Sequence, residues 1–154
     1  MSNLDYHSSI RVNVSAKKAY QDISRVSAWW AANLEGKTQN PGDSFTVRFG
    51  ETFVTFKILE AVADKKIVWK VIDCNLHWLK DKEEWKDTRI NWEILAQSNG
   101  TEINFTHFGL VPGIECYRDC EKGWNFFVKE SLFKLITEGK GLPEFPKVKR
   151  QVNN

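Results

Sequence analysis

The sequence has little net charge and no long apolar segment. It carries 22 basic and 20 acidic side chains over 154 residues, which leaves a formal net charge of +2. This near balance predicts no basic surface for nucleic acid and no strong attraction to a membrane. No window of ~18 apolar residues exists, so we expect no membrane span. The first residues, MSNLDYHSS, contain no apolar run, and we expect no signal peptide.

Cysteine is also scarce, and the motifs of common catalytic sites are missing. Three cysteines, an odd number without a secretion signal, indicate free thiols in a reducing, cytoplasmic location. We find no nucleophile elbow, no phosphate-binding glycine-rich loop, no metal-binding His–Glu helix and no cysteine pair at two-residue separation. We therefore assign no catalytic residue and expect no cofactor, and we favour a protein that is not an enzyme.

Aromatic side chains are the abundant class, with seven Trp and ten Phe. They carry a large apolar area in a defined shape, so they suit either a densely packed core or the wall of a pocket. Core packing explains most of them. Whether at least three of them face a ligand-accessible cavity stays open at this point.

Residues 100–141 organise the chain. Alternating apolar and polar residues over Thr101–Phe108 predict a half-buried strand. After a break that contains Pro112, apolar residues recur every three or four positions from Ile114 onward, which predicts one helix of about 25 residues, or roughly 37 Å. Its apolar stripe consists of Cys116, Cys120, Trp124, Phe127, Ser131 and Leu135. A helix this long needs a large curved surface to pack against.

Strands elsewhere in the chain supply that surface. Period-two patterns predict them at Tyr6–Val14, Ser44–Phe49, Thr52–Glu60, Ile67–Ile72 and Thr88–Ala96. Two segments between them lack such a pattern. Asn33–Asp43 is polar and predicts a loop. Asp73–Asp87 predicts a long connection, and a Trp-rich connection of this length is more often functional or a lid than a plain link.

Two short helices follow the first strand. The first covers Ala16–Ser24, with Ser15 as its N-cap. The second covers Ser27–Ala32. Neighbouring residues on a helix point about 100° apart, so we expect one of Trp29 and Trp30 in the core and the other near an opening.

This order of elements predicts an α+β fold. Strands that run in series with segregated helices indicate a curved antiparallel sheet of six to seven strands, wrapped around the long C-terminal helix. We expect a single domain over residues 1–141. Residues 142–154 contain two prolines and polar residues without periodicity, and we expect them to form a flexible tail.

Several short motifs occur in a characteristic order. They are Ser15–Tyr20, Trp29–Trp30, Glu84–Trp85, Trp92–Ile94, Gly100–Glu102, Thr106–Leu110, Gly123–Trp124, Leu132 and Gly139. Their order and spacing resemble the START-like (SRPBCC, Bet v-like) helix-grip superfamily over roughly Tyr6–Gly141. Within it, the likeness is strongest to homologues of the activator of heat shock protein 90 ATPase, in their C-terminal-domain form. The resemblance implies a seven-stranded sheet that grips the last helix, with a cavity between them.

The candidate ligand site lies in that cavity. Its predicted wall consists of Trp30, Phe45, Val47, Trp69, Val71, Trp92, Phe105, His107, Trp124 and Phe127. We expect a small apolar or amphipathic ligand and a monomer or weak dimer. Two other functions stay open. One is a co-chaperone-like interaction domain with a chaperone partner, and the other is an enzyme of cyclase or hydrolase type that uses the same cavity.

Three side chains carry possible further chemistry. His107 shares a strand face with Ile103 and Phe105, and it is either a buried core histidine, which we favour, or an acid–base group of the cavity. Cys116 and Cys120 lie one helical turn apart. With His107 at the end of the preceding strand they could approach a common point, which resembles a metal site in residue type. The spacing matches no standard zinc pattern, so we favour small buried thiols and expect no metal.

Overall fold

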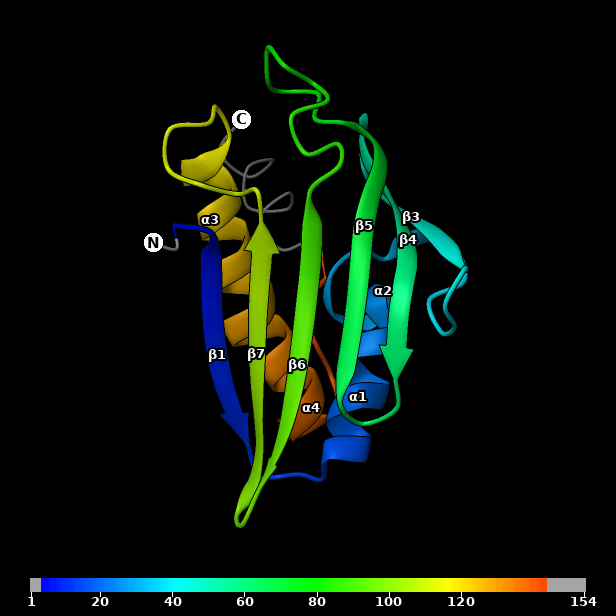
Figure 1. The fold of residues 1–154 in the computed structure, drawn as a ribbon, viewed down its shortest axis with the longest axis vertical. Helices are drawn as coiled ribbons and strands as arrows, with labels where there is room; N and C mark the ends of the chain where they lie inside the picture. Colours follow the sequence, from blue (N-terminus) through cyan, green and yellow to red (C-terminus); the bar gives the residue numbers. More distant parts are fainter. Residues whose placement is uncertain (1–3, 144–154) are drawn as a thin grey trace.

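The computed structural model describes residues 4–143. A seven-stranded antiparallel sheet forms its larger layer, in the order β1-β7-β6-β5-β4-β3-β2. The strands are β1 (Tyr6–Val12), β2 (Asn33–Gly36), β3 (Ser44–Phe49), β4 (Thr52–Val62), β5 (Lys66–Asn75), β6 (Arg89–Gln97) and β7 (Gly100–Phe108). The first and last strands of the chain therefore lie side by side (Figure 1).

All helices lie on one face of this sheet (Figure 1). They are α1 (Ala16–Ser24), α2 (Val26–Trp29), α3 (Tyr117–Phe126), the π-helical segment η1 (Phe127–Leu132) and α4 (Phe133–Glu138). The last three follow one another without a break and form the C-terminal helix. This helix contacts β1, and α1 contacts β6 and β7. The predicted helix-grip fold, α+β with the sheet curved around the C-terminal helix, is confirmed.

The core lies between the sheet and the helices, where the sequence pattern places it. In β1 the side chains alternate strictly between buried and exposed from Tyr6 to Val12. All six residues of the predicted helical stripe, from Cys116 to Leu135, are buried. Local signals fix the ends of two helices. The Ser15 hydroxyl accepts a hydrogen bond from the backbone N–H of Lys18 at the start of α1, and Gly139 ends α4 in the left-handed conformation.

Apart from shifts of one to three residues at the ends of several strands, three predicted segments are wrong. Asn33–Asp43 is not entirely a loop, because Asn33–Gly36 forms the edge strand β2, which pairs with β3. The second helix is Val26–Trp29 rather than Ser27–Ala32, because Arg25 links α1 directly to α2 and no side chain caps α2. The C-terminal helix begins at Tyr117 rather than Ile114, because the preceding residues form turns.

The predicted placement of the tryptophan pair is also wrong. Both Trp29 and Trp30 are buried, and their rings stack with centroids 6.0 Å apart and planes 17° apart. The expectation assumed that both residues lie within one regular helix. α2 instead ends at Trp29, and Trp30 is its C-cap residue with φ −115° and ψ −65°. This departure from regular helix geometry lets the two rings lie parallel.

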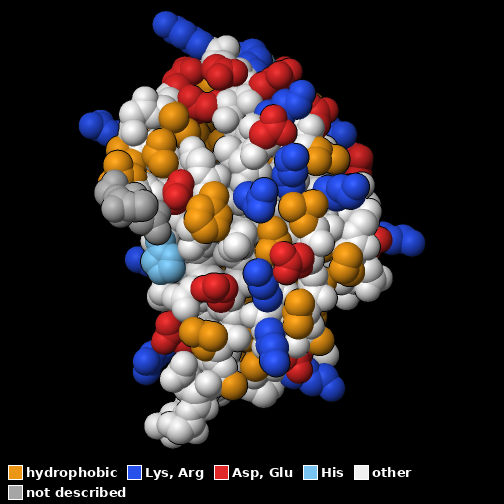
Figure 2. Space-filling view, viewed as in Figure 1, with side chains coloured by type: hydrophobic (Ala, Val, Ile, Leu, Met, Phe, Trp, Pro, Cys, Tyr) orange, Lys and Arg blue, Asp and Glu red, His pale blue; other side chains and the backbone are white. Residues whose placement is uncertain are grey.

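The face of the sheet that carries no helices is mixed in character. Figure 2 shows this face from the same side as Figure 1, with apolar side chains as separate spots between basic and acidic ones. The exposed apolar residues of the strands include Leu59, Val62, Ile72, Leu95 and Phe108. In β6, Leu95 is flanked along the outer face by Glu93 and lies opposite Glu102 of β7. No helix in residues 4–143 is long and apolar enough to cross a membrane.

The C-terminal end of the described chain is attached to the core. The Leu142 N–H donates to the Ser131 hydroxyl at 2.7 Å, and that hydroxyl donates to the Trp29 carbonyl at 2.7 Å. Gly141 makes this approach possible, because a Cβ there would lie 2.5 Å from the Ala28 carbonyl oxygen. Most of the predicted flexible tail, residues 144–154, lies outside the described residues.

Candidate functional site

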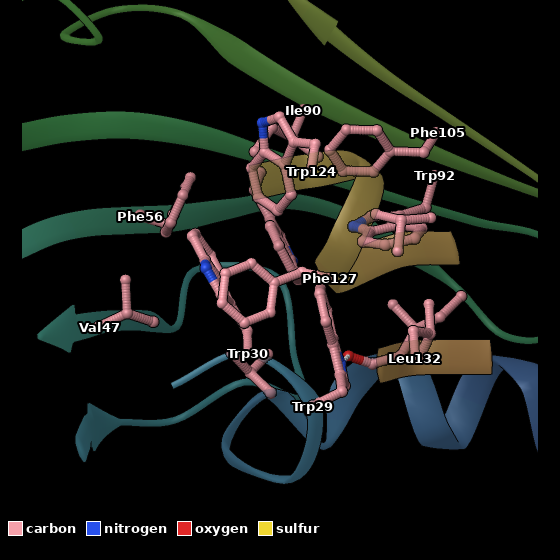
Figure 3. Packing of buried hydrophobic residues seen from close by; sticks show 14 of the residues in the cluster. Trp29, Trp30, Val47, Phe56, Ile90, Trp92, Phe105, Trp124, Phe127 and Leu132 are labelled. Atoms are coloured by element: carbon pink, nitrogen blue, oxygen red, sulfur yellow. Dashed lines mark hydrogen bonds between the residues drawn. The ribbon is translucent and has the colours of Figure 1, made fainter. Parts of the chain in front are cut away.

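Nine of the ten residues of the predicted cavity wall lie in one buried hydrophobic cluster, and the tenth, His107, is buried beside the Trp124 ring of that cluster. Trp30 directly follows α2, seven residues come from β3, β5, β6 and β7, and Trp124 and Phe127 come from the C-terminal helix. Figure 3 shows Trp30, Val47, Trp92, Phe105, Trp124 and Phe127 packed between the sheet and the helices, with Trp30, Trp124 and Phe127 near the centre. The sequence pattern therefore brings the predicted residues together.

Trp124 joins the two sides of this cluster. Its ring centroid lies 4.6 Å from that of Phe105 on β7 and 4.8 Å from that of Trp30 after α2. A third neighbour is Trp85, from the loop between β5 and β6, whose ring stacks on Trp124 at 5.9 Å with planes 14° apart. These offset and tilted contacts are the geometry that aromatic pairs prefer.

Two tryptophans of the cluster keep an unpaired polar group. The indole N–H groups of Trp69 and Trp92 have no hydrogen-bond partner within the described chain, although the side chains are only 1% and 0% exposed. The two residues lie on the neighbouring strands β5 and β6, with ring centroids 5.8 Å apart and planes 71° apart. Most buried donors in proteins are paired, and one left unpaired costs about 1–3 kcal/mol. These two donors therefore have unused capacity to bind an acceptor.

The two hollows that stand out in residues 4–143 lie at a different place. Both border the β6–β7 turn, at Ser98–Gly100, and the segment that follows β1, around Asn13. Neither is lined by any of the ten predicted cavity residues. That those ten residues line a ligand cavity stays a prediction.

His107 is a buried, neutral side chain beside the same cluster. The Trp124 indole N–H donates to its Nδ1 at 3.1 Å, so Nδ1 is unprotonated and the ring proton is on Nε2. Nε2 then donates to the Thr88 hydroxyl at 2.9 Å, and that hydroxyl donates to the Trp85 carbonyl at 2.6 Å. Complete burial lowers the histidine pKa from 6.5 to about 3. Since both nitrogens are occupied, His107 orders the core rather than serving as a free acid–base group.

The loop between β5 and β6, residues 76–88, is bound to the start of the C-terminal helix. The Glu84 carboxylate accepts hydrogen bonds from the backbone N–H groups of Glu115 and Cys116, at 2.8 and 2.9 Å. In return, the Glu115 carboxylate accepts from the N–H groups of Lys80 and Asp81. These bonds hold the pKa of the Glu115 carboxyl below its usual value. We call this set of bonds the loop–helix contact.

Two cysteines lie beneath this contact. Cys116 and Cys120 are both buried, and their sulfurs are 2.6 Å apart. The Trp85 indole N–H donates to the Cys116 sulfur at 3.2 Å. His107 does not complete a metal site with them, because its two nitrogens are bonded to Trp124 and Thr88. No group of three or more metal-ligating side chains is found in residues 4–143.

The role of the 76–88 loop was predicted only in part from the sequence. The sequence predicts that the Asp73–Asp87 connection is more often functional than a plain link, but it predicts no contact for Glu84. The pairing of Glu84 with Glu115 joins residues 31 positions apart, and no local pattern predicts such a contact. The one available signal was the occurrence of Glu84–Trp85 among the motifs of the helix-grip resemblance.

Solved structures support the fold. A homologue from Colwellia psychrerythraea, described as an Aha1 dimer, superposes with a TM-score of 0.74 at 22% identity, covering 90% of this chain and 100% of the other. A protein from Mesorhizobium loti gives 0.69 at 13% identity, with 89% and 98% covered. DynU16, from the dynemicin biosynthetic locus, gives 0.70 at 15% identity, with 91% and 49% covered. At these identities the likeness concerns the fold alone.

The sequence itself identifies the family. No curated protein matches it significantly. Residues 18–137, however, match the family described as "Activator of Hsp90 ATPase homolog 1-like protein". The matched segment extends from α1 to α4, so it includes the loop–helix contact and nearly all of the aromatic cluster. This chain is therefore a member of the activator of Hsp90 ATPase homolog 1-like family, with the START-like helix-grip fold.

Proposed function

We propose that this domain binds a small apolar or amphipathic molecule in its aromatic core, and that the indole N–H groups of Trp69 and Trp92 donate to an acceptor atom of that molecule. The observation that carries the proposal is the pair of buried donors without a partner on adjacent strands. A carbonyl, ether or carboxylate oxygen within hydrogen-bond distance of either donor would satisfy it. The surrounding rings of Phe45, Phe56 and Phe105 would contact the apolar part of the ligand.

Binding requires the rings to separate, because they pack against one another. The 76–88 loop is a segment whose movement would separate aromatic rings without breaking the residue pairs of β5 and β6. It inserts three side chains, Leu76, Leu79 and Trp85, of which only Trp85 carries a ring, and its polar bonds to the helix lie near the surface. Opening of residues 76–86 would uncover Trp124 and His107 while leaving intact the pairing of β5 with β6 and the backbone bonds of Asp87 and Thr88 to Val71.

A matched pair of probes tests this proposal. We would titrate 15N-labelled protein with 2-acetonaphthone, which has a carbonyl acceptor, and with 2-ethylnaphthalene, which has nearly the same shape and no acceptor. The ketone should move the indole N–H resonances of Trp69 and Trp92. It should also bind about 2- to 10-fold more tightly than the hydrocarbon, since one hydrogen bond contributes about 0.5–1.5 kcal/mol.

Two variants serve as controls for the ketone preference. Trp69→Phe and Trp92→Phe each keep an aromatic ring and remove one donor, so each should reduce that preference. The indole of Trp78, which is 49% exposed on the loop, reports non-specific surface binding. Equal binding of the two probes, or shifts confined to Trp78, would contradict the proposal.

The family description supports a second candidate, an interaction with a chaperone ATPase. The sheet face without helices would be the surface available for it, and its apolar side chains are separated by charges (Figure 2). The direct test is the ATPase rate of an Hsp90-type chaperone with and without this protein. An unchanged rate at saturating protein would count against this candidate.

A further inference from the structure

Cys116 and Cys120 form a close dithiol at the start of the C-terminal helix. Cys116 is the N-cap residue of α3, and Cys120 lies in its first turn. Their sulfurs are 2.6 Å apart, whereas a disulfide bond is about 2.05 Å long. Only a small movement therefore separates the two thiols from a covalent bond. Cys116 is 0% exposed and Cys120 is 7% exposed.

The surroundings distinguish the two sulfurs. Cys116 Sγ accepts hydrogen bonds from the Trp85 indole and from the Cys120 thiol. Its position at the N-terminal end of a helix also favours negative charge there. Cys120 keeps its proton, and its hydrogen bond to Cys116 together with its burial raises the Cys120 pKa above the usual value. Cys116 is therefore the sulfur placed to react first with an oxidant, with Cys120 as its partner thiol.

We propose that Cys116 and Cys120 are a redox-active pair that closes reversibly to an intrachain disulfide, and that closure loosens the loop–helix contact. With hydrogen peroxide as oxidant, the Cys116 thiol gives up its proton and its sulfur attacks one peroxide oxygen. A sulfur–oxygen bond forms, the oxygen–oxygen bond breaks, and the departing hydroxide takes up a proton to become water. The Cys120 thiol then gives up its proton, and its sulfur attacks Cys116. The sulfur–sulfur bond forms, the sulfur–oxygen bond on Cys116 breaks, and the departing hydroxide takes up the Cys120 proton to become a second water. The two thiols lose two electrons in total, and peroxide is reduced to two waters.

Closure acts on the loop through Trp85. A disulfide sulfur is a poor hydrogen-bond acceptor, and closure moves the Cys116 sulfur, so the buried Trp85 indole N–H loses its partner. The backbone N–H of Cys116 is one of the two groups that Glu84 binds. A change at Cys116 therefore affects two contacts of the loop: that of Trp85 with the Cys116 sulfur and that of Glu84 with the Cys116 backbone N–H. In a glutathione-buffered compartment the disulfide would be transient.

Thiol counting and peptide mapping test the first half of this inference. The full chain has a third buried cysteine, Cys74, so the Cys74→Ser variant is the reference protein. Treated with hydrogen peroxide, it should lose both of its thiols. Trypsin cleaves after Arg118 and Lys122, so the denatured digest should contain residues 90–118 linked to residues 119–122. Reductant should restore both thiols. Two thiols that survive peroxide, or that are lost without this linked peptide pair, would overturn the inference.

Variants and native proteolysis test the second half. Cys120→Ser keeps Cys116 and its contact with Trp85, and it should form no intrachain link. In the oxidised Cys74→Ser protein, the Trp85 indole resonance should move. Native trypsin should also cleave faster after Lys80, Lys82 and Lys86 of the loop. Formation of the disulfide with the Trp85 resonance and the cleavage rate unchanged would overturn the coupling to the loop.

Discussion

Acidification should destabilise this protein through one side chain, His107. In the folded chain its imidazole is completely buried and its pKa is lowered to about 3, against 6.5 for an ordinary histidine. Between these two values the unfolded chain binds a proton at this site and the folded chain does not. The contribution of His107 to stability is therefore complete above about pH 6.5 and falls steadily as the pH is lowered toward 3.

The size of the effect follows from the same two values. One pKa unit corresponds to about 1.4 kcal/mol, so at pH 5 the site should cost about 2 kcal/mol relative to neutral pH. Near pH 3 the cost approaches the order of 5 kcal/mol. A typical domain has a total stability of only about 5–15 kcal/mol. This single residue can therefore account for a large share of acid unfolding.

Urea unfolding at pH 7.5 and pH 5 measures this cost when the wild type is compared with His107→Gln. Glutamine does not titrate, and its amide can still donate to Thr88. The wild type should lose about 2 kcal/mol more than the variant over this pH step, because all other titrating groups are common to both. Equal losses in the two proteins would refute the reasoning. So would an NMR titration that finds the His107 ring protonated in the folded state at pH 5.

Three further substitutions test the packing around the site. Glu84→Gln should lower the free energy of unfolding by about 0.5–2 kcal/mol, as the loss of a helix cap does, and trypsin should cleave the loop faster. Glu83→Gln, at the exposed neighbouring residue, should change neither quantity. Gly123→Ala should stabilise the protein by about 0.5–1 kcal/mol, because the glycine lies within α3 and an added Cβ meets nothing within 4 Å. Gly141→Ala should lower the urea midpoint, because its Cβ would lie 2.5 Å from the Ala28 carbonyl oxygen. A stabilising Gly141→Ala or a destabilising Gly123→Ala would contradict the packing described.

Most of the fold could be predicted because its signals are local and repeated. The alternation in β7 and the helical spacing from Cys116 to Leu135 each indicate which face is buried. All six residues of the predicted helical stripe are indeed buried. The edge strand β2 has only four residues, Asn33–Gly36, of which one is partly buried, so it carries no pattern of its own. Its structure comes from pairing with β3. The spacing of apolar residues also does not distinguish the π-helical segment from the rest of the C-terminal helix.

The candidate site was predictable in composition but not in its contacts. Burial of the ten wall residues follows from which strand or helix face each one occupies. The bonds of Glu84 to Glu115 and Cys116, and the insertion of Trp85 above Trp124, depend on where a loop meets a helix some 30 residues later in the chain. A charged loop segment has the same sequence pattern whether it is solvated or bonded to backbone N–H groups. That part of the site required the tertiary structure.

Six of the seven tryptophans form a continuous series of ring contacts, each with centroids 6.0 Å apart or less. The series runs from Trp85 through Trp124, Trp30, Trp29 and Trp92 to Trp69. At such spacings the absorbing rings exchange excitation energy, so a photon taken up at one end can be emitted or quenched at the other. The ultraviolet emission and near-ultraviolet circular dichroism of this protein therefore belong to the array as a whole. Replacing one indole will change the optical behaviour of the remaining five, and Trp78 is the indole outside the array.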